Sequence, residues 1–566
     1  MVSRQRISVG KRTAALLSLV LILSGAAQAS TDAGAPTVTF SGSLLDGQSA
    51  TSFYRQPLST STSRDPDPPK YADRSSLPKF APIDPDHSHH PITGLDLGLD
   101  TRFRFEYRDN DLRQPNQAST RTPTAFTTPI KRYEQTDHVL LQRTRFYLGI
   151  REIADPFRFA IEIADSRRYG GSDFRPVPTG DEINTLEPIR LYGEIHLKDL
   201  LGYDHRGNSR PFSIRYGIHN FEFLDRRIIA NNQWRNTANA FQGFHGSIGQ
   251  GSNDWSADLL AIQPLKRLEY DRDEVTDPVW VYGVIGHWRT WSDFITVEPF
   301  YFQRRNPRYI DAANRFNTAR VVHSPGIRAY GTVPRTGFDF DGNLIPQFGT
   351  KGAYDIHDLA GTVDAGLPSA TRAAERIRAV GYTAELGYTW KDHPWRPRLG
   401  AFYGFASGDN LANPTYGRSP TNAQDLTDNR FERFYGFQRP WSAQDYIVFE
   451  NISAPKVRVE FQPMKDLRVD LGFGWFWLAS RTDRYLRANS SVGTSRDPNG
   501  TYGSHIGDEF DIRARYALTQ STEITIGYSH FKAGSFTEKT IWSTPSAPNG
   551  RGDSNFAYIE ISKRLF

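Results

Sequence analysis

The sequence predicts an all-β fold: a closed, antiparallel transmembrane β-barrel of about 18 strands, preceded by a signal peptide and a disordered lead-in. Three observations predict it. The stretch from Gly94 to Arg108 alternates apolar and charged side chains, later stretches repeat this alternation, and short connections alternate with long ones along the chain. A period of two is the side-chain geometry of a β-strand. Such strands have one face for an apolar environment and one for water.

The first 29 residues have the order of a secretory signal peptide. Four basic residues precede the ten-residue apolar run Ala14–Leu23, and Ala27-Gln28-Ala29 forms an A-x-A cleavage site. A helix that spans a membrane needs about 20 apolar residues, so we expect cleavage after Ala29 and not a membrane anchor. No later run in the sequence is apolar over the length of a spanning helix.

Residues 30–93 form a proline-rich lead-in. This segment contains nine prolines and many Ser, Thr and Asp residues with little periodicity, so it cannot bury enough apolar surface to offset its chain entropy. We expect a mostly disordered periplasmic segment. His87, His89 and His90 are residue types that bind metals, but no rigid element fixes their geometry, and a solvated turn is the favoured interpretation.

The composition excludes several classes of function. The chain has no cysteine, which excludes disulfides and cysteine metal sites. The formal net charge of +5 includes the four basic residues of the signal peptide, and the remaining chain carries +1, so the charge gives no argument for nucleic-acid binding. The sequence has no phosphate-binding glycine loop. We therefore expect no cofactor, no metal and no nucleic-acid partner.

The alternation defines a barrel over residues 94–566. In Gly94–Arg108, six of seven residues on one face are apolar or aromatic and six of seven on the other are charged. Similar strands are predicted at Arg143–Arg151, Phe157–Ala164, Ile189–Leu197, Phe212–His219, Lys456–Phe461, Leu467–Trp477 and Glu509–Tyr516, and less regular ones at Val279–Trp288 and Phe294–Gln303. A spacing of roughly 26 residues per strand and connection gives the count of about 18, which leaves an aqueous lumen.

The membrane environment follows from the strand ends and the connections. Aromatic residues such as Trp288 and Trp291 gather toward strand ends, as a girdle at a membrane interface requires. Short turns such as Glu152–Pro156 alternate with long loops such as residues 408–445, which is the pattern of bacterial outer-membrane barrels. Backbone groups in lipid must be paired, so the strands must close. We expect a monomeric barrel in the outer membrane of a Gram-negative bacterium.

Eight short motifs, in the right order along the chain, resemble the alginate export family of outer-membrane β-barrels. They are LQRTRF at 141–146 with ADSRRYG at 164–170, QWRNT at 233–237 with AFQG at 240–243, ASGD at 406–409, FWLA at 476–479, and IGDEFD at 506–511 with GYSHF at 527–531. The resemblance implies an outer-membrane channel that exports an anionic exopolysaccharide such as alginate passively, with periplasmic secretion partners.

Arginines on the polar faces of the first strands are the candidate pore lining. Alginate carries a carboxylate on every sugar, and a guanidinium stays charged and matches a carboxylate with two hydrogen bonds. Rings of Arg or Lys select anions in channels. The candidates are Arg102, Arg104, Arg143, Arg145, Arg190 and Arg215, with Glu194 on the same face, and the resemblance adds Asp165 and Arg167 as constriction residues.

Two structural alternatives compete with this pore lining. Acidic residues such as Asp100 and Glu162 lie on the same polar faces, so the arginines can instead form ion-pair ladders that keep the barrel rigid. Inward tyrosines such as Tyr147 can stack on sugars or simply pack. Catalysis is not expected, because Ser529 and His530 point to opposite faces of one strand.

Three functions remain open from the sequence. The first is passive export of an anionic exopolysaccharide. The second is a diffusion porin that is selective for small anions or sugars. The third is a structural or adhesive barrel whose lumen is plugged and whose long loops carry the function.

Overall fold

The computed structural model describes residues 95–111, 136–150, 154–171, 180–351, 375–409, 427–485, 497–539 and 553–564, apart from single residues and short gaps within these ranges. The predicted signal peptide and the lead-in lie outside the described residues, and both remain predictions. Among the described residues we find no helical segment with the length and hydropathy of a membrane span.

The described strands form one closed antiparallel barrel, as predicted. The sheet has 19 strands, of which the two-residue β16 (Thr427–Asp428) only adds in parallel to β14, so 18 strands make the wall. They are β1 (Leu95–Asp109), β2 (Thr136–Ile150), β3 (Phe157–Gly170), β4 (Asn184–Leu197), β5 (Phe212–His219), β6 (Phe241–Ile248), β7 (Trp255–Pro264), β8 (Trp280–Trp288), β9 (Ile295–Asn306), β12 (Arg320–Thr332), β13 (Phe338–Lys351), β14 (Glu375–Thr389), β15 (Arg398–Ala406), β17 (Ile452–Met464), β18 (Leu467–Trp477), β19 (His505–Thr519), β20 (Thr522–Ala533) and β21 (Ser554–Arg564).

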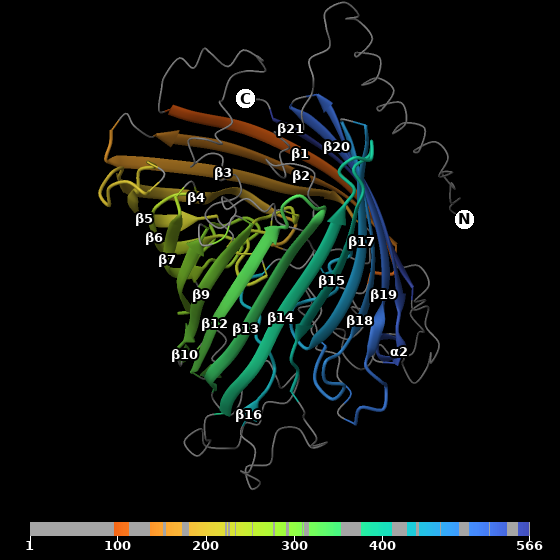
Figure 1. Ribbon diagram of the computed structural model, residues 1–566. Helices are drawn as coiled ribbons and strands as arrows, with labels where there is room; N and C mark the ends of the chain where they lie inside the picture. The colour runs from red at the N-terminus through yellow and green to blue at the C-terminus, as the bar shows by residue number, and fades with distance from the viewer. Residues whose placement is uncertain are drawn as a thin grey trace, which may run out of the picture. The chain divides into compact units, whose positions relative to one another are not determined.

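Each strand of the barrel pairs with the one before and after it along the chain. Figure 1 shows β1 to β4 side by side, followed in order by the strands up to β21. The barrel closes where β1 pairs with β21, because Arg102 lies opposite Arg143 of β2 on one side and Ser562 of β21 on the other. Outside the wall, the described residues form a hairpin of β10 (Tyr309–Ile310) and β11 (Phe316–Asn317) and the short helix α2 (Ser535–Thr537).

The two faces of the strands lie as the alternation predicts. On β1, Phe103 and Tyr107 are each 42% exposed, whereas Arg102 and Arg104 are each 2% exposed. Apolar side chains therefore cover the outside of the barrel, where lipid satisfies them, and charged side chains point into the lumen. The charged face is buried and not open to a wide channel, so something else must fill the lumen.

The connections differ at the two ends of the barrel. At one end most of them are short turns, such as residues 390–397 between β14 and β15 and residues 520–521 between β19 and β20. Trp390 and Trp395 are 45% and 49% exposed at this end, as expected for an interfacial girdle. At the other end the connections are long, and two of them fold back into the barrel.

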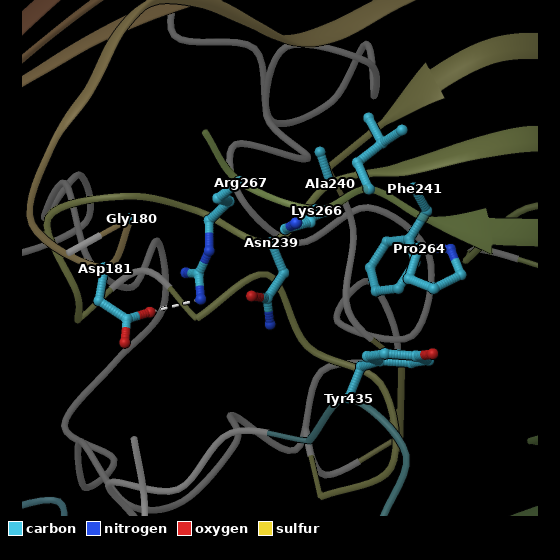
Figure 2. Close-up of a pocket in the computed structure, with 10 residues that line it drawn as sticks. Gly180, Asp181, Asn239, Ala240, Phe241, Pro264, Lys266, Arg267 and Tyr435 are labelled. Carbon is cyan, nitrogen blue, oxygen red and sulfur yellow. Dashed lines mark ion pairs between the residues drawn. The ribbon is translucent and has the colours of Figure 1, made fainter. Parts of the chain in front are cut away.

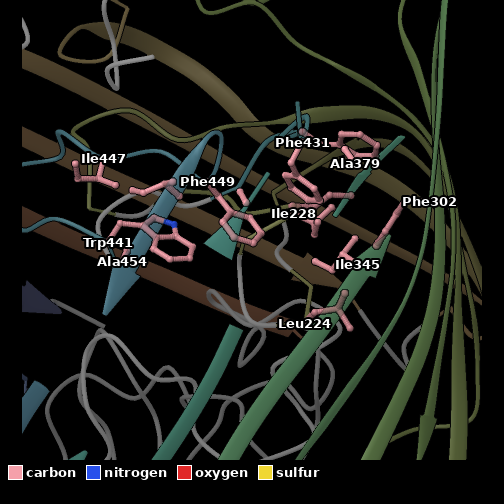
Figure 3. Packing of buried hydrophobic residues seen from close by; sticks show 14 of the residues in the cluster. Leu224, Ile228, Phe302, Ile345, Ala379, Phe431, Trp441, Ile447, Phe449 and Ala454 are labelled. Carbon is pink, nitrogen blue, oxygen red and sulfur yellow. The ribbon is translucent and has the colours of Figure 1, made fainter. Parts of the chain in front are cut away.

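The largest apolar core lies inside the barrel. It joins the described residues of the β5–β6 connection (within 220–240) and of the β15–β17 connection (407–409, 427–436 and 441–451) to inward side chains of the wall from β6 onward. Figure 3 shows Trp441 beside Phe449 and Ile228 beside Phe431. The Trp441 and Phe449 rings stack at 4.8 Å, and Phe431 follows with its ring 4.9 Å from that of Phe449.

This core fixes the two connections inside the lumen. A fully buried side chain of the size of Phe or Leu contributes about 1.5–3 kcal/mol, and the core contains Phe223, Leu224 and Ile229 of the first connection at no more than 1% exposure. We name these two segments together the plug. The sequence had not indicated which loops enter the pore.

Candidate functional site

Ion pairs connect the polar side chains of neighbouring strands on the inner wall. Arg145 of β2 bonds Asp100 of β1, with Nε 3.1 Å from Oδ2, and its Nη1 lies 3.7 Å from Glu162 of β3. Glu162 in turn forms an ion pair with Arg190 of β4, whose Nε lies 3.2 Å from its Oε2. Since all four side chains are at most 5% exposed, their charges balance one another inside the wall.

The same arrangement continues around the barrel. Almost every strand supplies an ionisable side chain that pairs with one on the next strand or, for Arg398–Asp339 and Lys456–Asp511, on the next strand but one. The pairs include Arg215–Glu194 (3.0 Å), His245–Asp258 (2.8 Å), His287–Asp258 (2.9 Å), His287–Glu298 (2.8 Å), Arg328–Glu298 (3.0 Å), Arg328–Asp341 (2.7 Å), Arg398–Asp339 (2.8 Å), Arg398–Glu460 (3.1 Å), Lys456–Asp511 (2.7 Å), Arg513–Asp470 (2.5 Å) and Arg104–Glu560 (3.3 Å).

Three of the predicted arginines also hold the plug. Arg104 donates from Nη1 to the Trp234 carbonyl at 2.6 Å, and its guanidinium lies 4.0 Å from the centre of the Trp234 ring. Arg102 and Arg143 both donate to the Arg235 carbonyl, at 2.9 and 3.3 Å. The guanidinium groups on this part of the wall therefore bind backbone carbonyls of the β5–β6 connection.

Asn236 is the polar anchor of the β5–β6 connection. Its side-chain amide nitrogen lies 2.9 Å from the Gln142 carbonyl, 3.0 Å from that of Arg167 and 2.8 Å from that of Glu182. The Ser166 hydroxyl donates to the Asn236 carbonyl at 2.7 Å. One side chain thus joins the plug to β2, to β3 and to the connection between β3 and β4.

Replacing Asn236 with alanine is expected to loosen the plug without unfolding the barrel. Each lost hydrogen bond costs about 0.5–1.5 kcal/mol, but the apolar core of the plug and the strand pairing remain. We expect single-channel currents in planar bilayers with a larger and noisier conductance. Asn208→Ala, in the connection between β4 and β5, is the control and should conduct as the wild type. A quiet, unchanged current in Asn236→Ala would contradict the role of this anchor.

A charged cluster lies where three connections meet at Arg235. Arg235 bonds Asp181 from the β3–β4 connection at 2.9 Å and Asp445 from the β15–β17 connection at 3.0 Å. Asp181 also pairs with Arg267 from the connection after β7. The arrangement fixes three loops to one another through a single guanidinium group.

Two further arginines lie in the same region. Arg484 pairs with Glu450 at 2.9 Å. Burial lowers the pKa of Arg433, the negative charge of Glu450 opposes this shift, and the positive charge of Arg235 adds to it. Arg433 is half-buried, and no carboxylate among the described residues lies within ion-pair distance of it.

These side chains form a constriction with a positive excess. We define the constriction as Arg235, Arg267, Arg433, Arg484, Asp181, Asp445 and Glu450. Four guanidinium groups face three carboxylates, which leaves one positive charge in excess. Arg433 forms no ion pair with a described carboxylate, although the charges of Glu450 and Asp445 act on it at longer range.

The structure brings the predicted residues together only in part. Arg102, Arg104, Arg143, Arg145, Arg190, Glu194 and Arg215 all belong to the inner wall. Arg190 is fully buried against Glu162, and the others are bonded to carboxylates or to the plug. Their role as a pore lining stays a prediction.

Asp165 and Arg167 lie elsewhere. They share the outward face of β3 with Ile161 and Ile163, and Arg167 pairs with Asp165 at 2.7 Å while 47% of its side chain is exposed. The constriction role that the resemblance implied does not fit this placement, because the inward residues at this level are Ser166 and its neighbours on the even positions.

The sequence analysis did not identify the arginines of the constriction. Arg235 lies in the QWRNT motif, which had been quoted only as a marker of the following strand. Arg433 and Arg484 lie in loops without periodicity. Trp234, a tryptophan between polar residues and outside any strand pattern, is the one sequence signal that could have indicated an inward anchor there.

Comparison with known protein families shows which family the chain belongs to. A family model described as alginate export matches residues 93–546. The chain belongs to the alginate export family. The protein is an outer-membrane β-barrel channel of a Gram-negative bacterium, and membership indicates a channel and not an enzyme. No curated protein sequence gives a significant match.

Several solved structures are similar to this chain at low sequence identity. OpdQ of Pseudomonas aeruginosa is 10% identical over 84% of this chain and 98% of its own, with a TM-score of 0.48. OccAB1 of Acinetobacter baumannii is 11% identical over 84% of this chain and 98% of its own, with a TM-score of 0.46. The outer-membrane protein OprD of Pseudomonas aeruginosa is 10% identical over 83% of this chain and 94% of its own, with a TM-score of 0.45. The strand pairing of the chain itself establishes its barrel fold.

Proposed function

We propose that this protein passes an anionic exopolysaccharide, such as alginate or a similar polyuronate, passively out of the cell. The observation that carries the proposal is the positive excess of the constriction, with Arg433 half-buried and in no ion pair with a described carboxylate. A positive site inside a low-dielectric wall attracts anions and focuses its field along the pore. Membership in the alginate export family supports the same cargo.

The ion-pair network gives this constriction its fixed geometry. Paired charges such as Arg145 with Asp100 hold the wall rigid and contribute little net field. The excess charge is then concentrated where the loops meet. A polymer with one carboxylate per sugar can exchange successive carboxylates at such a site without being trapped, because a single unbalanced charge binds weakly. Periplasmic partners that deliver the polymer, and surrounding outer-membrane lipid, belong to this proposal.

Planar-bilayer recording of the purified full-length protein tests the proposal. We expect an anion-selective current that alginate added on one side reduces in a concentration-dependent manner, because the polymer enters the constriction. Neutral dextran of the same length is the control and should reduce the current much less. A cation-selective current, or equal block by the two polymers, would contradict it.

A second candidate is a diffusion porin for small anions or sugars. The observation that favours it is the plug, whose aromatic residues such as Trp441 and Phe449 occupy the lumen beside the constriction. The same recording separates the two candidates. A current that monomeric glucuronate carries freely and that alginate leaves unchanged supports the porin.

A further inference from the structure

A pocket of about 390 Å³ lies beside the constriction, within the usual volume range of small-ligand pockets. Figure 2 shows Asp181 and Arg267 on one side of it and Phe241, Pro264 and Tyr435 on the other. Its walls come from four connections or strand ends that are distant in sequence.

The apolar side of the pocket is aromatic. The Phe241 and Tyr435 rings meet edge to face, with centroids 5.6 Å apart. Phe241 is fully buried and forms the base, whereas Tyr435 is half-buried and offers part of its ring to the pocket. Flat aromatic surfaces of this kind pack against the apolar C–H faces of sugar rings.

The polar side of the pocket has unused hydrogen-bonding capacity. Asn239 donates from its amide nitrogen to the Ala230 carbonyl at 3.0 Å, and no described residue donates to its amide oxygen. Lys266 is exposed and forms no ion pair with any described residue. An amide oxygen accepts from a sugar hydroxyl, and an ammonium group pairs with a carboxylate.

The pocket and the constriction share one carboxylate. Asp181 pairs with Arg267 in the pocket and with Arg235 in the constriction, where the Arg235 distance is 2.9 Å. Arg267 also donates to the Thr237 hydroxyl at 3.2 Å, within the QWRNT motif. The pocket and the constriction therefore adjoin each other through Asp181 and Arg267.

We propose that this pocket binds a single uronate ring of the exported chain, with Tyr435 against the sugar face, Asn239 on a hydroxyl and Lys266 on the ring carboxylate. The proposal rests on the proposed function, because it names where the polyuronate is held next to the constriction. The pocket then acts as a binding subsite that retains one sugar while the neighbouring sugar passes Arg235.

Equilibrium binding of trisaccharides to the detergent-purified full-length protein tests the subsite. The probes are an alginate trisaccharide and neutral mannotriose. Lys266→Gln should weaken binding of the alginate trisaccharide about fivefold to tenfold and leave mannotriose unchanged, since only the acidic ligand uses the ammonium group. Tyr435→Leu should weaken both ligands by a similar factor, since both use the aromatic face.

Matched controls lie outside the pocket. Lys391→Gln, in the turn between β14 and β15, and Tyr203→Leu, in the connection between β4 and β5, should bind both trisaccharides as the wild type does. Unchanged affinity in both pocket variants, or equal wild-type affinity for acidic and neutral trisaccharides, would overturn the subsite. The proposed function is tested by a different measurement. It fails if alginate does not reduce the current in the planar bilayer, whatever the trisaccharide affinities are.

Discussion

Replacing Arg145 with glutamate is expected to prevent assembly of the barrel. Arg145 is 5% exposed, and its guanidinium lies 3.1 Å from Asp100 and within 3.7 Å of Glu162. The substitution would place three carboxylates together inside the wall with one cation removed. Removal of one partner from a buried ion pair costs about 3–5 kcal/mol, and the added negative charge increases that cost.

The matched control is Arg167→Glu on the next strand. Arg167 pairs with Asp165 on the outward face of β3 with almost half of its side chain exposed, and exposed pairs contribute little to stability. Migration of unheated protein on denaturing gels, together with protease resistance after refolding in detergent, measures assembly. We expect folded protein for Arg167→Glu and none for Arg145→Glu. A folded Arg145→Glu barrel would show that the network contributes little.

Charge reversals at the predicted pore-lining arginines are therefore a poor test of anion selectivity. A charge reversal at Arg145 or Arg190 removes a structural ion pair before it alters any field in the pore. Loss of current in such a variant would say nothing about selectivity. Charge reversals are informative only at arginines that the wall does not require.

The strand faces were predictable because two physical demands act on every residue of a spanning strand. Because lipid lies outside the barrel and polar groups lie inside it, the apolar residues of a strand must face outward and the charged ones inward. The outward position of Phe103 and the inward position of Arg102 therefore follow from the sequence alone. The same rule, extended along β3 from Ile161 and Ile163, places Asp165 and Arg167 outside. The family resemblance suggested the opposite, and the local alternation was the better guide.

Which charges pair depends on neighbouring strands and could not be read from one strand. The Arg145–Glu162 contact needs the register of β2 against β3, which sets Arg145 opposite Ala164 and Tyr147 opposite Glu162. The acidic residues on the polar faces indicated that ion-pair ladders were possible. They did not indicate which arginine pairs with which carboxylate. Partner choice is a long-range property of the sheet.

The plug was the least predictable part. Its residues, such as Phe431 and Trp441, lie in a connection without periodicity, and their burial depends on apolar positions of the inner wall of distant strands, such as Phe402. Those wall positions interrupt the polar inner faces, and they are the reason that the middle strands alternate less cleanly. An apolar residue on the lumen side is therefore a usable sign that a loop enters a barrel.

Replacing Arg433 with glutamate is expected to leave the barrel folded and to reduce its anion selectivity about three- to tenfold. No described carboxylate pairs with Arg433, so its removal leaves no buried partner without a counter-charge. The substitution changes the constriction from one positive charge in excess to one negative. Reversal potentials in a salt gradient across a planar bilayer measure the permeability ratio of anions to cations.

Two further variants make the result specific to the constriction. Arg433→Gln removes one charge instead of reversing it and should give an intermediate ratio, whereas Arg305→Glu, exposed on the outer part of β9, makes the same charge change away from the constriction and should behave as the wild type. A graded order of wild type, Arg433→Gln and Arg433→Glu follows only if the charge at this position acts on passing ions. Equal ratios in all four proteins would mean that the plug closes the path past Arg433 and that ions cross the barrel along another part of the lumen.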